Sequence, residues 1–281
     1  LQTGDVPDAF CRSEIVPVYK KGKDPEQAES YRPINLVDTL CKVFERCLLS
    51  LIEPNLEGRL TPFQQAYLRY RSADTCLLRI SQRMQLARAA GLCTSVVSFD
   101  LTRGFECVRR YRVLEKLLDD LQLDARIVNV FKNYLLNRYH RVRVSAAGHE
   151  AVSAWVKVPV GVPQGSVLGP LLFIIDVDGA VGNMQTHQVQ QGIPEAHKAE
   201  FCVYADDHTL LTHAADIETL RVRTRSNVAR FANWCSSHQY AISPGKSQYH
   251  IVGTPERCLL AVEGRRISYA VHMRILGVHF S

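Results

Sequence analysis

The chain has 281 residues, of which 46% are hydrophobic and 22% are charged, and its formal net charge is +6 at pH 7. These values are typical of a globular protein and exclude a disordered chain, and the length allows one large domain or two to three subdomains. The 9 cysteines include no Cys-x-x-Cys pair, so neither a zinc site nor a disulfide framework is predicted. The mild excess of positive charge is compatible with a polyanionic partner.

The first part of the chain is predicted to contain short strands and two long helices. The second of these helices has a candidate N-cap at Asp74 and ends before Gly91. Strands are expected at residues 15–19, 31–36 and 95–101. The first helix ends at Pro54, and its apolar side chains, which repeat at helical spacing, are expected in the core: Leu40, Val43, Phe44, Cys47, Leu48, Leu51 and Ile52.

The second part of the chain alternates helices with hairpins. Two helices are predicted over 111–122 and 125–136, followed by a β-hairpin over 138–160 with its turn near 146–149. Residues 162–177 then run from a Gly/Pro-rich loop into a helix. An amphipathic helix begins near Ile217 and is followed by a loop and short strands. This mixture, without regular βαβ alternation, predicts an α+β fold.

An acidic pair, Asp206 and Asp207, lies inside a run of strand-forming residues from Phe201 to Leu211. The pattern predicts two strands joined by a tight turn that carries both carboxylates. Adjacent carboxylates repel each other, so a fold that directs both to one place requires a cation between them. A polar hairpin turn is the alternative, because Asp is common in turns. The acidic pair alone leaves both interpretations open.

Several segments resemble, in the same order, the motifs of one protein family. These segments are residues 20–24, 30–36, 99–105, 161–173, 204–207, 243–247 and 275–278. The whole set makes the chain similar, over nearly its full length, to the reverse transcriptase of a non-LTR (LINE-type) retrotransposon. The resemblance implies a right-hand polymerase fold, with fingers at 1–73 and 113–159 and a palm at 74–112 and 160–281. The thumb is expected to be largely absent, because the chain ends just after a segment like the primer grip.

The resemblance also implies a catalytic mechanism in which two metal ions assist the attack of a primer 3′-hydroxyl on an α-phosphate. Asp100, Asp206 and Asp207 correspond to the metal ligands, and the carbonyl of Leu101 is a possible further ligand. The expected cofactor is Mg²⁺, as two ions, with Mn²⁺ as a substitute. Lys246 corresponds to a lysine that protonates the leaving pyrophosphate. The alternative for a loop lysine is simple solvation.

Five further residues correspond to positions that contact the incoming nucleotide. Lys20 and Arg32 match fingers residues that bind the triphosphate, for which charge-assisted hydrogen bonds are suited. Phe105 matches an aromatic residue that blocks the ribose 2′-hydroxyl, although an aromatic side chain is otherwise most often core. Gln164 and Gly165 match a turn that lies against the new base pair, and a helix N-terminus is compatible with the same sequence.

Basic residues suggest where template and primer phosphates bind. Arg138, Arg141 and Arg143 form a basic strand, and binding to phosphates through them would be sensitive to salt. Leu276 and Gly277 belong to the segment that resembles the primer grip. For the arginines of the amphipathic helix that begins near Ile217, a solvated face is the favoured interpretation.

The implied partners are an RNA template, a DNA primer and dNTPs. Because the chain begins at Leu1 rather than Met, we expect it to be part of a larger element polyprotein that also carries an endonuclease. No signal peptide and no membrane-spanning apolar run is recognisable. An intracellular location is therefore expected, nuclear when the enzyme acts on chromosomal DNA.

The chain departs from the family pattern at two places. Gly104-Phe105-Glu106 stands where Ala-Phe-Asp is common, and Tyr67-Leu68-Arg69 stands where Gly-Phe-Arg is common. These departures allow a second hypothesis, a catalytically decayed relic that only binds nucleic acid. A third hypothesis is another right-hand polymerase, such as an intron-type maturase or an RNA-dependent RNA polymerase. Phe105 and the length of the Gly-Val-Pro-Gln-Gly match argue against the RNA polymerase.

Overall fold

The structure is a computed structural model that describes residues 3–146, 148–253 and 258–280. It divides into two compact units, each built from two separate stretches of chain. The first unit comprises Leu1–Leu60 and Phe105–Asp176, and the second comprises Thr61–Gly104 and Val177–Ser281. The fingers (1–73 and 113–159) and palm (74–112 and 160–281) expected from the sequence are also discontinuous, and the two compact units have different boundaries from them. No helix within the described ranges is long and apolar enough to cross a membrane.

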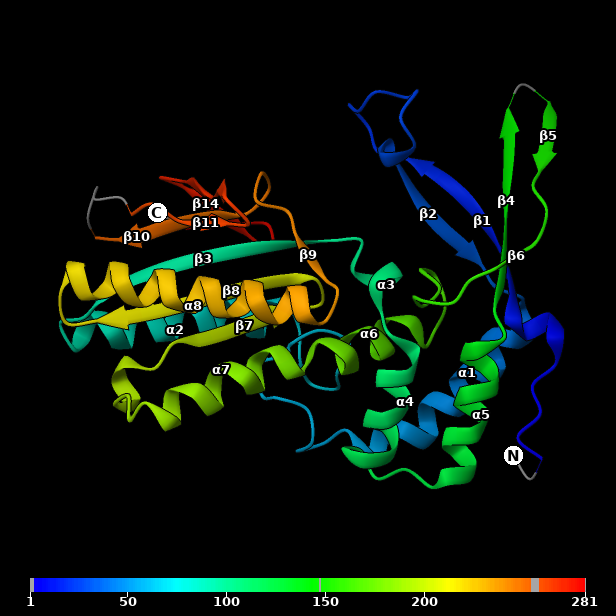
Figure 1. The fold of residues 1–281 in the computed structure, drawn as a ribbon, viewed down its shortest axis with the longest axis horizontal. Helices are drawn as coiled ribbons and strands as arrows, with labels where there is room; N and C mark the ends of the chain where they lie inside the picture. Colours follow the sequence, from blue (N-terminus) through cyan, green and yellow to red (C-terminus); the bar gives the residue numbers. More distant parts are fainter. Residues whose placement is uncertain (1–2, 147, 254–257, 281) are drawn as a thin grey trace. The chain divides into compact units, whose positions relative to one another are not determined.

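The first unit contains a five-stranded sheet in the order β2-β1-β4-β5, with β6 paired to β4 (Figure 1). β1 runs antiparallel to β2 and parallel to β4. The predicted hairpin over 138–160 is confirmed, because β4 and β5 pair antiparallel. Part of its expected turn, Ala147, lies outside the described residues. The strands are β1 (Arg12–Tyr19), β2 (Tyr31–Leu36), β4 (Tyr139–Ala146), β5 (His149–Val152) and β6 (Val156–Lys157).

Helices gather at one end of this sheet (Figure 1). The expected core face of α1 is wrong in part, because Leu40, Val43 and Cys47 are exposed. The helix instead buries Cys41, Glu45, Leu48 and Ile52, which recur at three- and four-residue spacing. The helices of the first unit, of which η2 lies in the connection between β1 and β2, are η1 (Asp8–Cys11), η2 (Ala28–Ser30), α1 (Thr39–Ile52), η3 (Glu53–Asn55), α3 (Gly104–Cys107), α4 (Arg110–Asp119), α5 (Ala125–Leu136) and α6 (Gly169–Val177).

The second unit is built on a six-stranded sheet in the order β13-β10-β3-β8-β7, with β9 paired to β3. The long strand β3 pairs antiparallel with β10, β8 and β9, so it lies at the centre. Two small hairpins complete the unit. The strands are β3 (Cys93–Thr102), β7 (Glu200–Tyr204), β8 (Asp207–Ala214), β9 (Ala241–Ile242), β10 (Gln248–Val252), β11 (Ala261–Val262), β12 (Arg265–Arg266), β13 (Ser268–Tyr269), β14 (Met273–Ile275) and β15 (Val278–Phe280).

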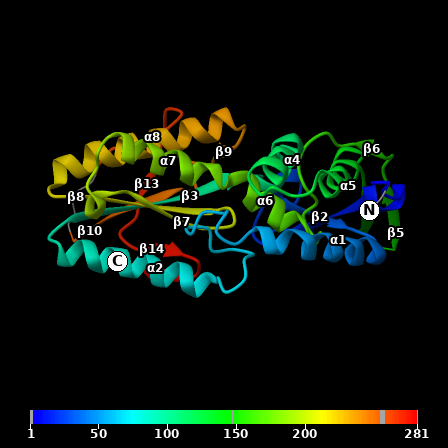
Figure 2. The same ribbon diagram turned by 90° about the horizontal axis from the view of Figure 1, so that it is seen from below.

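Helices cover both faces of this sheet. α7 (Gly179–Gln190) and α8 (Ile217–Ser237) lie on one face, and α2 (Ala73–Ala89) lies on the other (Figure 2). A short helix, η4 (Glu195–His197), precedes β7. The N-cap of α2 is Ser72 rather than the predicted Asp74, because Ser72 and Thr75 form a reciprocal capping box.

Two apolar layers hold β3, β7 and β8 in register. On the α2 side, a cluster of buried residues joins α2, the three strands and β14. On the α8 side, Phe231 packs against Phe99 and Phe201 with ring centroids 4.6 and 5.1 Å apart. Because a one-residue slip would turn these side chains to the wrong faces, the packing fixes the register of the strands. The first cluster consists of Cys76, Ile80, Val96, Cys202, Leu211, Met273 and Ile275.

Buried histidines predict how the stability of the fold depends on pH. Burial lowers the pKa of His140, His208 and His213 from 6.5 to about 4. A histidine whose pKa is lowered by folding stabilises the protein above pH 6.5, and this stability is lost as the pH falls toward 4. We expect the free energy of unfolding to fall between pH 6.5 and pH 4, by about 1.4 kcal/mol per pH unit for each histidine at most.

Thermal unfolding followed from pH 7 to pH 4 measures this effect. His213→Gln is expected to flatten the pH dependence, whereas the same change at the exposed His149 leaves it as in the wild type. A melting temperature that stays constant down to pH 4.5 would contradict the prediction.

Candidate active site

The pairing of three strands brings the predicted acidic residues together within the second unit. β3 and β8 pair antiparallel with Asp100 directly opposite Asp207. The β7–β8 hairpin pairs Tyr204 with Asp207, which leaves Ala205 and Asp206 as its two-residue turn. Opposite residues of antiparallel strands have their Cα atoms about 4.5–5.5 Å apart. The strand–turn–strand prediction is therefore confirmed, and Asp100 lies beside it.

Burial and neighbouring carboxylates disfavour the charged forms of Asp206 and Asp207. Burial, followed by the charges of Asp206 and Asp100, raises the pKa of Asp207 to about 6. Burial is also the largest cause of the raised pKa of Asp206, to which Asp100 adds and which Lys246 opposes. Both residues of the acidic pair keep surface exposure. The site thus concentrates negative charge at an accessible position.

A loop before β10 encloses Asp100 from the other side. The Lys246 ammonium lies 3.2 Å from the Asp100 Oδ2 atom. The backbone N–H of Asp100 donates to the Ser247 hydroxyl at 3.2 Å, and its carbonyl accepts from the N–H of Ser243 at 2.8 Å. The predicted loop lysine is therefore held against a predicted metal ligand, with its side chain 69% exposed.

The chemistry of this donor set fits a hard divalent cation. Carboxylate oxygens are the ligands that Mg²⁺ and Ca²⁺ prefer. Within the described ranges, no group of three His, Cys, Asp or Glu side chains is already arranged around a common point for a metal ion. A cation placed among Asp100, Asp206 and Asp207 would relieve the repulsion that raises the pKa values of the acidic pair.

The predicted Pro-Gln-Gly turn lies in the first unit against β2. The Gln164 carbonyl accepts a hydrogen bond from the Asn35 N–H at 2.8 Å. Gly165 has φ +118°, and a Cβ there would lie 2.8 Å from the Asn35 carbonyl oxygen. Only glycine adopts this backbone conformation without strain and allows so close an approach. The Gln164 side chain is half-buried.

The other predicted nucleotide-binding residues also lie in the first unit. Phe105 is half-buried and stacks on Phe173, with centroids 4.9 Å apart and an interplanar angle of 17°. The Lys20 ammonium donates to the Glu29 carbonyl at 2.8 Å. Arg32 is exposed on β2. The structure therefore leaves Arg32 the most accessible of these side chains.

Arg138, one of the residues predicted to bind phosphates, does not lie at the surface. Its side chain is fully buried, lies 4.7 Å from the ring centroid of Tyr134, and donates to the Phe10 carbonyl at 3.4 Å. Arg141 and Arg143 remain accessible, and both form ion pairs with Glu14. Two arginines share one carboxylate, so a net positive charge remains there.

Leu276 and Gly277 form the two-residue turn between β14 and β15, in which Ile275 pairs with Val278. Their φ values of +47° and +87° are those of a type I′ hairpin. Met273 and Ile275 belong to the core cluster beside α2 and β7. The segment that resembles a primer grip is thus anchored in the same unit as the acidic residues.

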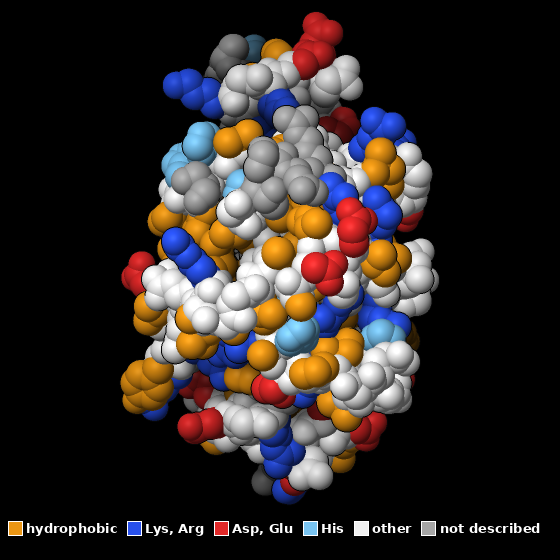
Figure 3. All heavy atoms as spheres, turned by 90° about the vertical axis from the view of Figure 1, so that its left-hand side faces the viewer, with side chains coloured by type: hydrophobic (Ala, Val, Ile, Leu, Met, Phe, Trp, Pro, Cys, Tyr) orange, Lys and Arg blue, Asp and Glu red, His pale blue; other side chains and the backbone are white. Residues whose placement is uncertain are grey.

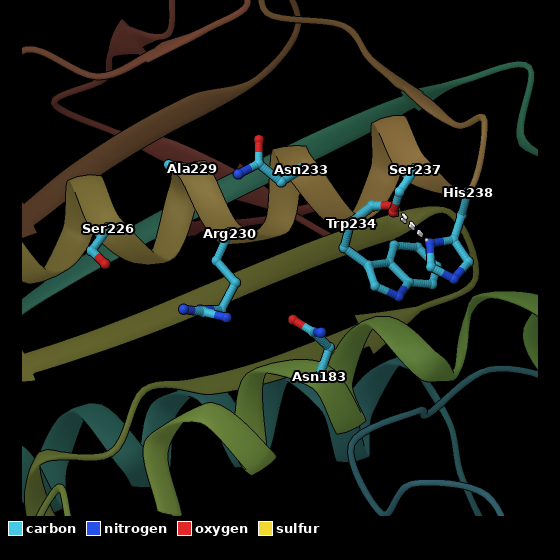
Figure 4. Close-up of a pocket in the computed structure, with 8 residues that line it drawn as sticks. All are labelled: Asn183, Ser226, Ala229, Arg230, Asn233, Trp234, Ser237 and His238. Carbon is cyan, nitrogen blue, oxygen red and sulfur yellow. Dashed lines mark hydrogen bonds between the residues drawn. The ribbon is translucent and has the colours of Figure 1, made fainter. Parts of the chain in front are cut away.

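The surface shows two further features of the second unit. On the face in Figure 3, basic and acidic side chains are interspersed with apolar ones and do not form one basic patch. A groove of about 530 Å³ lies between α7 and α8, where Asn183 and Arg230 point toward each other and Trp234 stacks on His238 (Figure 4). No carboxylate lines this groove, so it is distinct in chemistry from the acidic site.

One residue of the acidic site, Gln64, was not predicted from the sequence. The side chain of Gln64 reaches the backbone of the acidic turn, where its Oε1 atom accepts from the Ala205 N–H at 3.4 Å. No local pattern marks Gln64, because it lies outside any regular element and is distant in sequence from the turn. The only signal nearby is the departure from the family pattern at residues 67–69.

Comparison with known proteins identifies the class of protein to which this fold and site belong. Residues 18–280 match the family described as "Reverse transcriptase (RNA-dependent DNA polymerase)". The chain therefore belongs to the reverse transcriptase family. This confirms the resemblance inferred from the sequence motifs.

Curated relatives come from mobile elements of flies. The chain is 27% identical over 243 residues to the probable RNA-directed DNA polymerase from transposon BS of Drosophila melanogaster, covering 86% of this chain and 26% of that protein. It is 25% identical over 286 residues to the polymerase from mobile element jockey of Drosophila funebris, covering 99% of this chain and 30% of that protein. The chain thus spans less than a third of the length of these relatives.

Solved structures show the fold. Apo telomerase from Candida tropicalis, truncated from its C-terminal domain, superposes with a TM-score of 0.62 at 12% identity, covering 92% of this chain and 54% of that chain. Telomerase from Candida albicans superposes with a TM-score of 0.56 at 14% identity, covering 98% of this chain and 45% of that chain. The right-hand polymerase fold predicted from the sequence is therefore confirmed.

Proposed function

We propose that this chain is the catalytic region of an RNA-directed DNA polymerase that adds deoxynucleotides to a primer 3′-hydroxyl during retrotransposition. The observation that carries the proposal is the convergence of Asp100, Asp206 and Asp207 on adjacent strands within a chain of the reverse transcriptase family. Phosphoryl transfer needs positioning and charge stabilisation more than covalent chemistry. Three carboxylates at one accessible site meet that need by holding cations.

The acidic residues and the Leu101 carbonyl would hold two divalent cations, Mg²⁺ with Mn²⁺ as a substitute. When bound, these ions supply the positive charge that lowers the pKa of the primer hydroxyl and stabilises the leaving pyrophosphate. The raised pKa values of Asp206 and Asp207 support this role, because the protein alone does not neutralise their charges. Lys246, 3.2 Å from Asp100, would donate the proton that the leaving pyrophosphate takes up.

Residues of the first unit would bind the nucleotide. The exposed Arg32 and the half-buried Lys20 offer cationic groups for the triphosphate. Phe105, held by its stack on Phe173, would exclude a ribose 2′-hydroxyl. The Gln164 side chain and the bare backbone of Gly165 would contact the new base pair.

Template and primer would bind through accessible basic and turn residues. Arg141 and Arg143 carry more positive charge than Glu14 neutralises, and so offer contacts for phosphates. The turn at Leu276 and Gly277 would contact the primer strand. Because the chain spans less than a third of the length of its relatives, it would act within a larger polyprotein, and the resemblance of its motifs implies that this polyprotein also carries an endonuclease. Its place of action would be inside the cell, in the nucleus when chromosomal DNA is the target.

Removal of divalent cations tests the proposed function. Full-length protein carrying this chain is expected to extend a DNA primer on an RNA template with dNTPs in Mg²⁺, and to prefer dNTPs over rNTPs. A chelator should abolish extension, because the carboxylates then repel the phosphates, and added Mg²⁺ should restore it. Binding of element RNA, measured in parallel, separates this proposal from the decayed relic, which would bind RNA without extending the primer. Extension that persists in the chelator would overturn the proposed mechanism.

A further inference from the structure

A segment outside the regular sheet lies along β7, and we call residues 61–71 the strap. The strap belongs to the second unit and is joined to β7 by backbone hydrogen bonds. The Gln65 N–H donates to the Val203 carbonyl at 2.8 Å, and the Val203 N–H donates to the Phe63 carbonyl at 3.0 Å. Gln64 therefore pairs with Val203 in a parallel bridge. The strap extends the sheet next to the hairpin that carries Asp206.

Side chains fix the shape of the strap. The Arg71 guanidinium donates from Nη1 to the carbonyls of Thr61 at 2.9 Å and Gln64 at 2.6 Å. The Thr75 hydroxyl, at the start of α2, donates to the Gln65 Oε1 atom at 2.8 Å. Because both ends and the middle are held, the strap is a rigid support and not a loose connection.

The Gln64 side chain points from the strap to the acidic turn. It is only 1% exposed, and its Oε1 atom accepts from the N–H groups of Ala66 at 2.9 Å and Ala205 at 3.4 Å. Ala205 is itself buried, so its N–H would lack a partner without this acceptor. Its φ of +56° lies in the left-handed region that non-glycine residues seldom adopt, and Asp206 follows directly. A hydrogen bond at this point therefore bears on the direction of the Asp206 side chain.

We propose that Gln64 is a positioning residue for Asp206. By accepting the Ala205 N–H, it holds the left-handed turn and thereby fixes where the Asp206 carboxylate points. The inference rests on the proposed metal-binding role of Asp206. Outer groups that orient metal ligands commonly change metal affinity or activity by about 10- to 100-fold when they are removed. Gln64 acts less directly than such groups, because it binds the backbone of Ala205, the residue before the proposed metal ligand Asp206.

Another residue of the strap, Tyr67, interacts electrostatically with Asp206. Burial and, after it, the Asp206 carboxylate raise the pKa of Tyr67. Tyr67 is 52% exposed and has φ +58°. The strap therefore lies near the acidic turn both at Gln64, which is in the core, and at Tyr67, which is at the surface. This arrangement supports a role for the strap in shaping the acidic site.

The experiment compares two neighbouring glutamines of the strap in full-length protein. Gln64→Met keeps the size of the side chain and removes the acceptor for Ala205. Gln65→Met is the matched control, because Gln65 is also buried, at 6% exposure, but its side chain bonds to Thr75 and Pro62 and not to the hairpin. The readouts are the rate of single-nucleotide incorporation and the Mg²⁺ concentration that gives half of the maximal rate. Thermal unfolding of both variants reports general loss of stability.

We expect Gln64→Met to raise the half-saturating Mg²⁺ concentration, or to lower the maximal rate, by about tenfold or more. Gln65→Met should lower the melting temperature to a similar extent without changing the Mg²⁺ dependence. Wild-type Mg²⁺ dependence and rate in Gln64→Met would overturn the inference, as would an equal change in Gln65→Met. If Gln64→Met does not fold, Gln64→Asn serves instead, because its shorter side chain keeps an amide but loses the reach to Ala205.

Asp206→Asn in the same assay separates the two proposals. If this variant retains extension, the proposed metal site itself is wrong. If it abolishes extension while Gln64→Met behaves as the wild type, only the positioning role fails.

Discussion

Asp206→Asn is expected to lower primer extension on an RNA template by about 1000-fold or more, equivalent to about 4 kcal/mol of transition-state stabilisation. Asparagine has nearly the same size and fits the turn, so the change removes charge without removing shape. The loss follows because Asp206, with Asp100 and Asp207, would hold the cations that stabilise the transferred phosphate. Single-nucleotide incorporation under saturating dNTP measures the effect.

The same substitution should stabilise the protein when a chelator is present. Folding raises the pKa of Asp206, so its charged form destabilises the folded state at pH 7. This destabilisation is absent at a pH low enough to protonate the carboxyl in both the folded and unfolded states, so the gain from Asp206→Asn should disappear on acidification. Asp216→Asn is the control of opposite sign, because hydrogen bonds from Thr219 at the N-cap of α8 lower the pKa of Asp216, so this substitution should give no gain in stability at pH 7. Extension within tenfold of the wild type in Asp206→Asn would refute the assignment.

Lys246→Gln is expected to slow nucleotide incorporation by about 100-fold, within the usual contribution of a general acid. The substitution removes the proposed proton donor, which lies 3.2 Å from Asp100. Lys246→Arg separates charge from proton transfer, because arginine keeps the ion pair but does not release its proton at neutral pH. If protonation of pyrophosphate is the role, both variants are slow. The measurement is the pre-steady-state rate of single-nucleotide addition.

A surface lysine in the same unit provides the control for Lys246. Lys198 pairs with Glu195 at 2.6 Å, and Lys198→Gln should leave incorporation unchanged. Full activity of Lys246→Arg would assign the residue an electrostatic role in place of proton donation. Full activity of Lys246→Gln would remove it from the reaction.

Local patterns predicted most of the secondary structure. The helix over 125–136 has the predicted bounds, and the acidic hairpin and the hairpin of β4 and β5 are both present. Apolar periodicity, turn residues and capping residues act over a few positions, so they can be recognised in a sequence. The N-cap at Ser72 shows the limit of this approach, because several capping residues compete within one turn.

The sequence did not determine which side chains are buried. Arg138 was expected on one basic strand with Arg141 and Arg143, but it lies just before β4 and is the one of the three that Tyr134 and Phe10 enclose. In α1, Leu40 and Val43 have the expected spacing but face outward. The cause is the same in both cases: a pattern defines a face of an element, and only the neighbours decide whether anything covers it.

By itself, the sequence determined the family, the α+β fold and the acidic residues, because these depend on short motifs in a set order. Only the tertiary structure decided that Asp100 lies opposite Asp207, that Lys246 contacts Asp100, and that Gln64 supports the acidic turn. Asp100 and Asp207 are 107 positions apart in the sequence, and Asp100 and Lys246 are 146 positions apart. Gln64 and Ala205 are 141 positions apart. Strand register and core packing bring them together, and neither is written in any local stretch of chain.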